Sequence, residues 1–326
     1  MQTRTDAVDL PVRPPARGSG HASRARLPSA RRRALTARSD RAGLRQLAGH
    51  LAAIAFTGCW IGSRLPLWPL ALLLHGVLLV FLFTALHECV HRSAFATRRL
   101  NDAVAALCGA VLFLSPEWFR RFHLAHHRHA QDPERDPELA VPRPRTWREY
   151  LLHVSGLPTW RCAITTLLVN AVGRKVREPY VPASAERRVR RESRRMLALY
   201  AGIALVSVAG GSSAALTLWL LPMLLGQPVL RLYLLAEHGR CPFVADSFVN
   251  TRTTFTNALV RALAWNMPYH AEHHAFPAVP FHRLPDLHRL VRAQLRTTSR
   301  GYARFNGEYA RGLTAGTQAG EGGDTG

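Results

Sequence analysis

Nine of the 16 histidines in this chain stand at spacings that suit metal binding. His87 and His91 lie four residues apart in HECVH, and the segments HLAHH and HAEHH contain histidines three and four residues apart. Residues at these separations share one face of a helix, so each group can present two or three imidazole nitrogens in one direction. The ninth histidine stands at the end of LLAEH. The candidate metal ligands are His87, His91, His123, His126, His127, His238, His270, His273 and His274.

The number of these imidazoles indicates two metal ions rather than one. Zinc takes about four ligands and iron up to about six, so nine nitrogens exceed the coordination sphere of a single ion. Imidazole suits iron, and a pair of irons with open coordination positions could bind dioxygen. His50 and His75 stand alone in apolar segments, and we expect them to be ordinary core residues.

HECVH also matches the zinc-protease pattern H-E-x-x-H, in which Glu88 would be the general base beside one metal-bound water. This alternative gives HLAHH and HAEHH no role. A metal transporter would require ligands near the middle of a membrane, whereas these histidines stand at the ends of apolar segments. The intramembrane zinc metalloprotease therefore stays a remote alternative, which the metal content would distinguish.

Four polar residues are candidates for orienting the histidines, because a metal-bound imidazole usually donates its other N–H to a carboxylate or carbonyl oxygen. Asp132 and Asp136 follow HLAHH in the segment QDPERDPEL, and Glu272 lies inside HAEHH. Asn266, four residues before His270, could contact a metal or its bound water. The sequence leaves open whether these carboxylates orient ligands or are solvated turn and capping residues.

The composition excludes several classes of protein. Lys and Arg number 43 against 21 Asp and Glu, but the basic residues flank apolar segments and no nucleic-acid-reading module accompanies them. We therefore expect no nucleic acid as a partner. The five cysteines include no C-x-x-C pair, which excludes zinc ribbons and covalent haem attachment. Any electron carrier must be a separate protein.

Long apolar segments predict membrane-spanning helices. Residues 47–63 and 65–86 each approach or exceed the roughly 20 residues needed to cross a bilayer. Residues 196–236 are interrupted by GGSS at 210–213 and predict a second helical hairpin. The apolar segment 103–114 is too short to cross and is expected to form a re-entrant or interfacial helix.

The charge distribution predicts the orientation of these hairpins. Arginines crowd the segments before the first and third spans, which by the positive-inside rule places both termini and all nine histidines in the cytoplasm. The predicted fold is all-α: four transmembrane helices in two hairpins, with a cytoplasmic, histidine-rich di-iron cap. Residues 1–45 are expected to form a disordered basic tail, 46–300 the membrane domain and 301–326 a flexible tail. The arginine-rich composition, with Lys175 the single lysine, favours a bacterial genome, and the expected location is the bacterial inner membrane.

In this order, the three boxes H-x-x-x-H, H-x-x-H-H and H-x-x-H-H resemble those of the membrane fatty acid desaturases and hydroxylases. NMPYHAEHHAFPAVPFHRLPDLH resembles many acyl-lipid desaturases, and FHLAHHRHAQDPERDPEL resembles both these enzymes and carotenoid ketolases. The resemblance covers about residues 50–295. It implies a desaturase-like membrane domain at 46–300 and two ferrous ions bound by the nine histidines, with His238 lying outside the three boxes.

The expected activity is oxygen-dependent desaturation. With O2 as co-substrate and two external electrons, such a centre removes hydrogen from an unactivated C–H bond of an acyl chain. The expected substrate is an acyl-lipid, acyl-CoA or acyl-carrier, and the expected donor is a separate ferredoxin or cytochrome b5. A lipid or carotenoid hydroxylase or ketolase is the main alternative. The basic surface is also expected to contact membrane lipid.

Overall fold

The computed structural model describes residues 28–173 and 178–314, and they are mostly helical. The first half contains α1 (Ser29–Leu35), α2 (Asp40–Gly62), α3 (Trp68–His91), α4 (Arg98–Leu112), α5 (Pro116–His129), a 3-10 turn η1 (Pro137–Ala140), α6 (Trp147–Ser155) and α7 (Leu157–Val172). The second half contains α8 (Ala183–Ala209), a π-helical turn η2 (Leu216–Leu220), α9 (Leu221–His238), α10 (Ser247–Asn250), β1 (Thr253–Thr254), α11 (Ala258–Leu263), α12 (His270–Ala275), η3 (Phe281–Arg283), α13 (Leu284–Val291), η4 (Arg292–Gln294), β2 (Thr298–Ser299) and α14 (Tyr302–Arg311).

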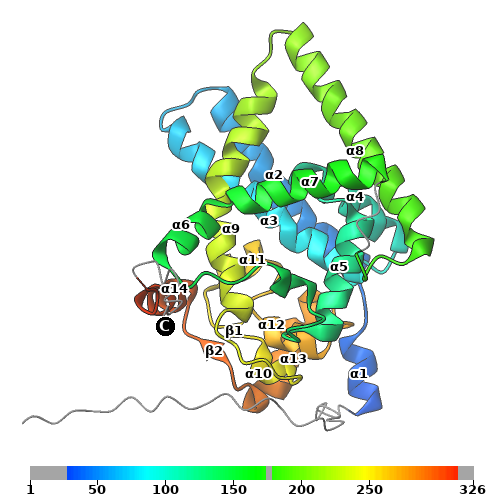
Figure 1. Cartoon of the computed structure of the whole chain (residues 1–326), viewed down its shortest axis with the longest axis vertical. Helices are drawn as coiled ribbons and strands as arrows, with labels where there is room; N and C mark the ends of the chain where they lie inside the picture. The colour runs from blue at the N-terminus through cyan, green and yellow to red at the C-terminus, as the bar shows by residue number, and fades with distance from the viewer. Residues whose placement is uncertain (1–27, 174–177, 315–326) are drawn as a thin grey trace, which may run out of the picture.

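Helices α3 and α9 form the centre of the molecule and pack closely together (Figure 1). Two glycines make this approach possible: a Cβ at Gly76 would collide with the Pro222 carbonyl, and one at Gly226 with the backbone of Gly76. Small residues at a helix crossing let two backbones come near enough for close packing. The crossing brings the C-terminal ends of α3 and α9, where His91 and His238 stand, to the same end of the bundle.

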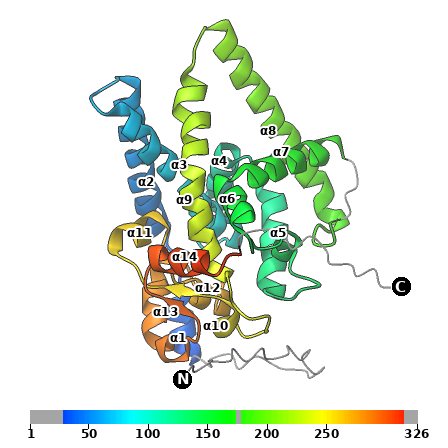
Figure 2. The same ribbon diagram turned by 60° about the vertical axis from the view of Figure 1, so that its left-hand side comes forward.

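Two helical hairpins point away from that end. Figures 1 and 2 show the α2–α3 turn and the α8–η2 turn at the end of the molecule opposite α12 and α13, with α8 and α9 diverging into a V. Inside the first hairpin, His75 bonds to Thr57 Oγ1 (2.7 Å) and to the Leu218 carbonyl oxygen (3.0 Å). His50 bonds to the Leu78 carbonyl oxygen (2.8 Å). Both histidines are buried, as predicted for core residues.

The described helices include two that are long and apolar enough to cross a membrane, Trp68–His91 and Leu216–His238. A third is obtained if α4 and α5, which meet at a 96° bend, are counted as one broken span. The apolar segments predict four crossings, but α2 and α8 are not among the helices that are both long and apolar enough to cross a membrane. They continue into charged sequence: α2 begins at Asp40, and the first half of α8 is rich in arginine. The bend after Leu112 suits the predicted re-entrant character of 103–114.

Short elements close the histidine end of the bundle. Helices α10 to α13 and the two-residue parallel strands β1 and β2, with Thr253 opposite Thr298, lie around the ends of α3 and α9 (Figure 1). Because these elements have few residues each, their positions depend on packing rather than on intrinsic helix stability.

The described parts of the two predicted tails, 1–45 and 301–326, contain helices. Helix α1 and the first turns of α2 occupy 29–45, where Leu35 is buried. Helix α14 occupies 302–311 and buries Phe305 and Tyr309 against Tyr150 and Leu235. An i, i+4 aromatic pair therefore anchors a segment that was expected to be flexible. Residues 1–27 and 315–326 of the predicted tails lie outside the described residues.

Candidate metal centre

Four helices bring the nine histidines together. His87 and His91 occupy the last turns of α3, and His238 is the last residue of α9. The 96° bend between α4 and α5 directs α5 back beside the end of α3, which places HLAHH there. Helix α12 has the sequence HAEHHA, and its His273 and His274 rings lie beside those of His91 and His238. The convergence comes from the turns between elements, which the spacing within each box does not specify.

The ring nitrogens form two groups in which one nitrogen from each histidine lies within 4.8 Å of the others. The first group contains His87, His91, His123, His127 and His273, and the second contains His126, His238 and His274.

Nitrogen–nitrogen distances within the groups fit coordination to a shared ion. His91 Nε2 lies 2.8 Å from His123 Nε2 and 3.3 Å from His273 Nε2. In the second group, His126 Nε2 lies 3.2 Å from His238 Nε2. Two nitrogens bound about 2.1 Å from one ion at a right angle lie about 3 Å apart.

Neighbouring residues of one box contribute to different groups. His126 belongs to the second group and His127 to the first, and His273 and His274 divide in the same way. Consecutive residues on a helix point about 100° apart, so each H-x-x-H-H segment can reach two positions. The rings of His127 and His274 stack with centroids 3.9 Å apart, which joins the two groups. The arrangement therefore suits a pair of adjacent ions.

His270 belongs to neither group but lies beside the second. Its ring centroid is 4.6 Å from that of His274 and 5.1 Å from that of His238. Its Nδ1 lies 3.5 Å from Glu237 Oε1. Eight of the nine predicted ligands are thus gathered into groups, and the ninth stands at the edge of one.

The residues present fit a metal, because several buried ring nitrogens lack any protein partner. Both nitrogens of His87, His127 and His274 are buried without a hydrogen bond among the described residues. Leaving such a group unsatisfied costs roughly 1–3 kcal/mol, so several together call for a ligand. A donor set made only of imidazoles suits iron, copper, nickel or zinc rather than magnesium or calcium.

The electrostatic surroundings keep the α12 histidines in the metal-binding form. Burial, with the neighbouring imidazoles second, lowers the pKa of His270, His273 and His274 well below the ordinary 6.5. At neutral pH these side chains are therefore uncharged and keep a nitrogen lone pair for a metal.

Asp136 is the predicted carboxylate that reaches the histidines. Its Oδ1 accepts a hydrogen bond from His126 Nδ1 (2.9 Å), while its Oδ2 accepts one from the Gln131 backbone N–H (2.8 Å). Burial acts to raise the pKa of Asp136, but these hydrogen bonds and the His126 charge leave the pKa below its ordinary value. Asp136 therefore fixes the His126 ring so that Nε2 faces His238.

The other three polar candidates are directed elsewhere. Asp132 forms an ion pair with Arg135 (2.5 Å), because both lie in an exposed turn. Glu272 is fully buried, but its carboxylate accepts hydrogen bonds from Thr253 Oγ1 (2.5 Å) and His288 Nδ1 (2.5 Å). It points from α12 toward β1 and α13 rather than toward the ring nitrogens. The side-chain amide of Asn266 donates to the Phe281 carbonyl oxygen (3.1 Å) instead of contacting a histidine.

Glu88, the acid of HECVH, has structural partners. Its Oε2 accepts hydrogen bonds from Ser93 Oγ (3.0 Å) and the Phe281 backbone N–H (3.0 Å). Its Oε1 lies 3.8 Å from His273 Nδ1. A protease base must face a metal-bound water, whereas this buried carboxylate holds the chain after α3 and faces the far nitrogen of a grouped histidine. The geometry disfavours the protease alternative.

Two orienting groups carry no signal in the sequence. The backbone carbonyl oxygen of Asn250 lies 3.3 Å from His238 Nδ1, and the side chain of Gln131 donates to the His238 carbonyl oxygen (3.0 Å). A carbonyl can come from any residue type, so only the path of the chain identifies Asn250. Gln131 has a recognisable side chain, but no histidine spacing connects it with His238.

Two helices that are long and apolar enough to cross a membrane end at a histidine-lined site that could hold metal ions, which is an arrangement typical of membrane metalloenzymes. The family model described as "Fatty acid desaturase" matches residues 63–306, which include all nine histidines. The chain belongs to the fatty acid desaturase family and is a desaturase-type oxidoreductase. It is 26% identical over 265 residues to dihydrorhizobitoxine desaturase of Bradyrhizobium elkanii, across 77% of this chain and 74% of that protein.

Proposed function

We propose that the protein is a membrane fatty acid desaturase that introduces a double bond into an acyl chain with O2 and external electrons. The observation that carries the proposal is the pair of adjacent, largely buried histidine groups joined by the stacked rings of His127 and His274. Two iron ions in these groups would supply the oxidising chemistry needed for an unactivated C–H bond.

The chain's own residues would hold and protect this centre. His87, His91, His123, His127 and His273 would bind one iron, and His126, His238 and His274 the other, with His270 at the edge of the second group. Asp136 would orient His126. All of these histidines are buried except His91 and His127, which are half-buried, so bulk water has limited access and a reactive centre would be protected from side reactions.

The proposed membrane arrangement has four crossings. α2 and the apolar half of α8 would cross beside α3 and α9, even though charged residues extend these two helices. Exposed apolar side chains support this placement: Leu205, Val206 and Val208 of α8 are 70–81% exposed, as expected for surfaces that meet lipid. The histidine cap and both termini would face the cytoplasm of a bacterial inner membrane, because arginine clusters precede the first and third crossings.

The proposed substrate is an acyl chain carried by lipid, CoA or carrier protein, and the proposed donor is a separate ferredoxin or cytochrome b5. The relative's name, dihydrorhizobitoxine desaturase, supports a double bond as the product. It also makes dihydrorhizobitoxine one of the substrates to be tested. A lipid hydroxylase or carotenoid ketolase would use the same histidines, but its product would carry an added oxygen instead of a new double bond.

The test combines metal content with product mass. We expect about two irons per purified chain, and host lipids lighter by two hydrogens when the protein is expressed with a donor. His127→Ala and His273→Ala should lower both the iron content and the product. His129→Ala is the matched control, because His129 ends α5 outside both groups. A product heavier by one oxygen would indicate a hydroxylase, and one zinc retained by both variants would restore the protease alternative.

A further inference from the structure

One acid beside the histidine groups has no role in the site described above. Glu237 stands in the last turn of α9, directly before His238, and its side chain is 13% exposed. A negative charge is disfavoured at this end of a helix, because the unpaired carbonyl oxygens form the negative end of the helix dipole. An acid in a helix that is apolar enough to cross a membrane is also costly, and such residues usually have a functional partner.

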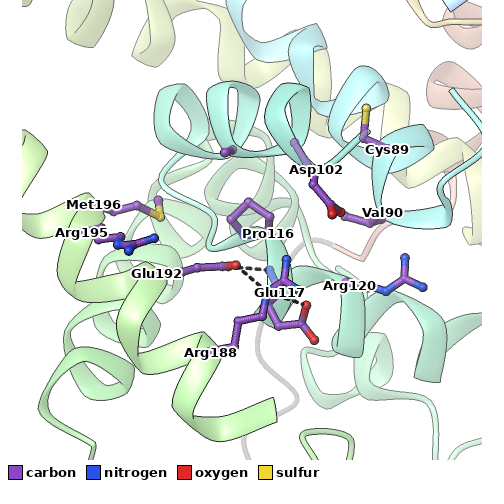
Figure 3. Close-up of a pocket in the computed structure, with 12 residues that line it drawn as sticks. Cys89, Val90, Asp102, Pro116, Glu117, Arg120, Arg188, Glu192, Arg195 and Met196 are labelled. Atoms are coloured by element: carbon purple, nitrogen blue, oxygen red, sulfur yellow. Dashed lines mark hydrogen bonds and ion pairs between the residues drawn. The ribbon is translucent and has the colours of Figure 1, made fainter. Parts of the chain in front are cut away.

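Two other acids, on α5 and α8, show the usual alternative, which is an ion pair with arginine. Glu117 lies 3.3 Å from Arg188, and Glu192 lies 3.0 Å from the same guanidinium group (Figure 3). Glu237 differs from both. Among the described residues, the only basic nitrogen close enough for an ion pair with its carboxylate is His270 Nδ1. The ring of His270 is therefore the partner that can account for this acid.

His270 needs an acceptor on the side that faces Glu237. His270 is buried, and its Nδ1 has no hydrogen bond within the part of the chain that the structure describes. Glu237 Oε1 lies 3.5 Å away, so the two atoms must approach by about 0.5 Å to reach an ordinary hydrogen-bond distance. Small rotations of the glutamate side chain can make this shift, because its terminal torsion has a broad minimum.

This contact bears on the second histidine group. The His270 ring centroid lies 4.6 Å from that of His274 and 5.1 Å from that of His238. An imidazole that donates a hydrogen bond from Nδ1 keeps the Nε2 lone pair free for a metal, and the acceptor fixes the direction of the ring. Glu237 itself belongs to neither histidine group. The last turn of α9 thus supplies one ligand, His238, and one acid that faces a neighbouring ring.

We propose that Glu237 is the positioning residue of His270: its carboxylate accepts the Nδ1–H and turns Nε2 toward the second group. The ion of that group thereby gains a fourth imidazole. Glu237 acts through the ring and does not touch the ion. The inference rests on the proposed two-ion centre, because it concerns the ligands of one of the two ions.

The test measures the affinity of the purified full chain for Fe²⁺, by anaerobic dialysis against graded concentrations of a chelator. Glu237→Leu keeps a similar volume but removes the acceptor, so it should hold one of the two ions about 10- to 100-fold more weakly than the wild type. Glu237→Gln keeps an acceptor oxygen and should weaken that ion less than Glu237→Leu does. The control Glu308→Leu changes an exposed acid on α14 and should match the wild type.

A double-mutant cycle separates positioning from a general effect on the fold. His270→Ala should weaken the same single ion, and Glu237→Leu should then have no further effect on iron affinity, because the ring through which it acts is gone. Additive losses would overturn the proposal, and so would wild-type affinity for both ions in either single variant. A wild-type chain that binds fewer than two ions would overturn the proposed function itself, and this inference with it.

Discussion

At the scale of single residues, two aspartates four positions apart in one segment have different roles. Asp136 is buried and accepts a hydrogen bond from His126, whereas Asp132 forms an ion pair with Arg135 in an exposed turn. The sequence QDPERDPEL presents both with the same motif, D-P-E. Only the carboxylate that reaches a ring nitrogen can influence the metal.

We expect Asp136→Asn to lower the affinity for iron about 10- to 100-fold, because a carboxylate that orients a metal-bound imidazole contributes to its basicity and geometry. Asp132→Asn is the matched control and should retain wild-type iron content after dialysis against a graded series of chelator concentrations. Equal iron loss in the two variants would show that Asp136 has no orienting role.

Glu272 lies within a histidine box but should affect stability instead of metal binding. Its carboxylate accepts hydrogen bonds from Thr253 and His288, and hydrogen bonds to a charged group are worth roughly 1.5–3 kcal/mol. We therefore expect Glu272→Gln to lower the melting temperature while the iron-to-protein ratio of the folded fraction stays constant. Loss of iron without loss of stability would contradict this assignment.

At the scale of elements, the crossing of α3 and α9 depends on glycine. A Cβ at Gly76 would collide with the Pro222 carbonyl, while one at Gly202 on α8 meets nothing within 4 Å. Gly76→Ala should destabilise the protein by about 1–3 kcal/mol through overpacking. Gly202→Ala should be neutral or slightly stabilising, because alanine favours a helix. The free energy of unfolding of both variants can be measured by adding a denaturant to the protein in mild detergent and monitoring the loss of helical circular dichroism.

The packing of α6 on α9 should weaken in acid. Burial and the nearby Arg231 lower the pKa of His153 from 6.5 to about 4. His153 therefore takes up a proton more readily in the unfolded chain than in the folded one. Protonation favours the unfolded chain, so the free energy of unfolding falls as the pH drops from 6.5 through about 4. The loss is of the order of 2 kcal/mol at pH 5.

His153→Gln should remove much of this pH dependence, which thermal melts between pH 7 and pH 5 would detect. His129→Gln serves as the control substitution. An unchanged pH profile in His153→Gln would show that other groups determine the acid sensitivity.

At the scale of the whole molecule, metal should link four helices that meet at one end of the bundle. Helix α12 has only six residues, and three of them are histidines, so it depends on the shared ligand more than the longer helices α3 and α9 do. We expect a chelator to lower the melting temperature and to increase amide exchange in α12 first, with recovery on adding Fe²⁺. Uniform exchange in all four helices would indicate that metal does not hold α12.

The sequence alone was sufficient to predict the local features of this protein, namely the histidine faces of its helices and the apolar helical hairpins. Histidine spacings of three and four residues identify shared helix faces, and the apolar segments locate the α2–α3 and α8–α9 hairpins. Both signals are local, since they depend only on helical periodicity and on the length of an apolar segment. Apolar length does not reveal where a helix ends, so the starts of α2 and α8 in charged sequence and the docking of α14 were not predicted.

Only the tertiary structure decided which residues meet. It assigned His126 and His127, which are adjacent in the chain, to different groups, and it left His270 outside both. It directed Asp136 toward a histidine and Glu272 away from one, and it brought the Asn250 carbonyl to His238. The physical reason is that these contacts join elements far apart in the chain. Their geometry is determined by the 96° bend between α4 and α5 and by the close crossing of α3 and α9, which no spacing within a single box encodes.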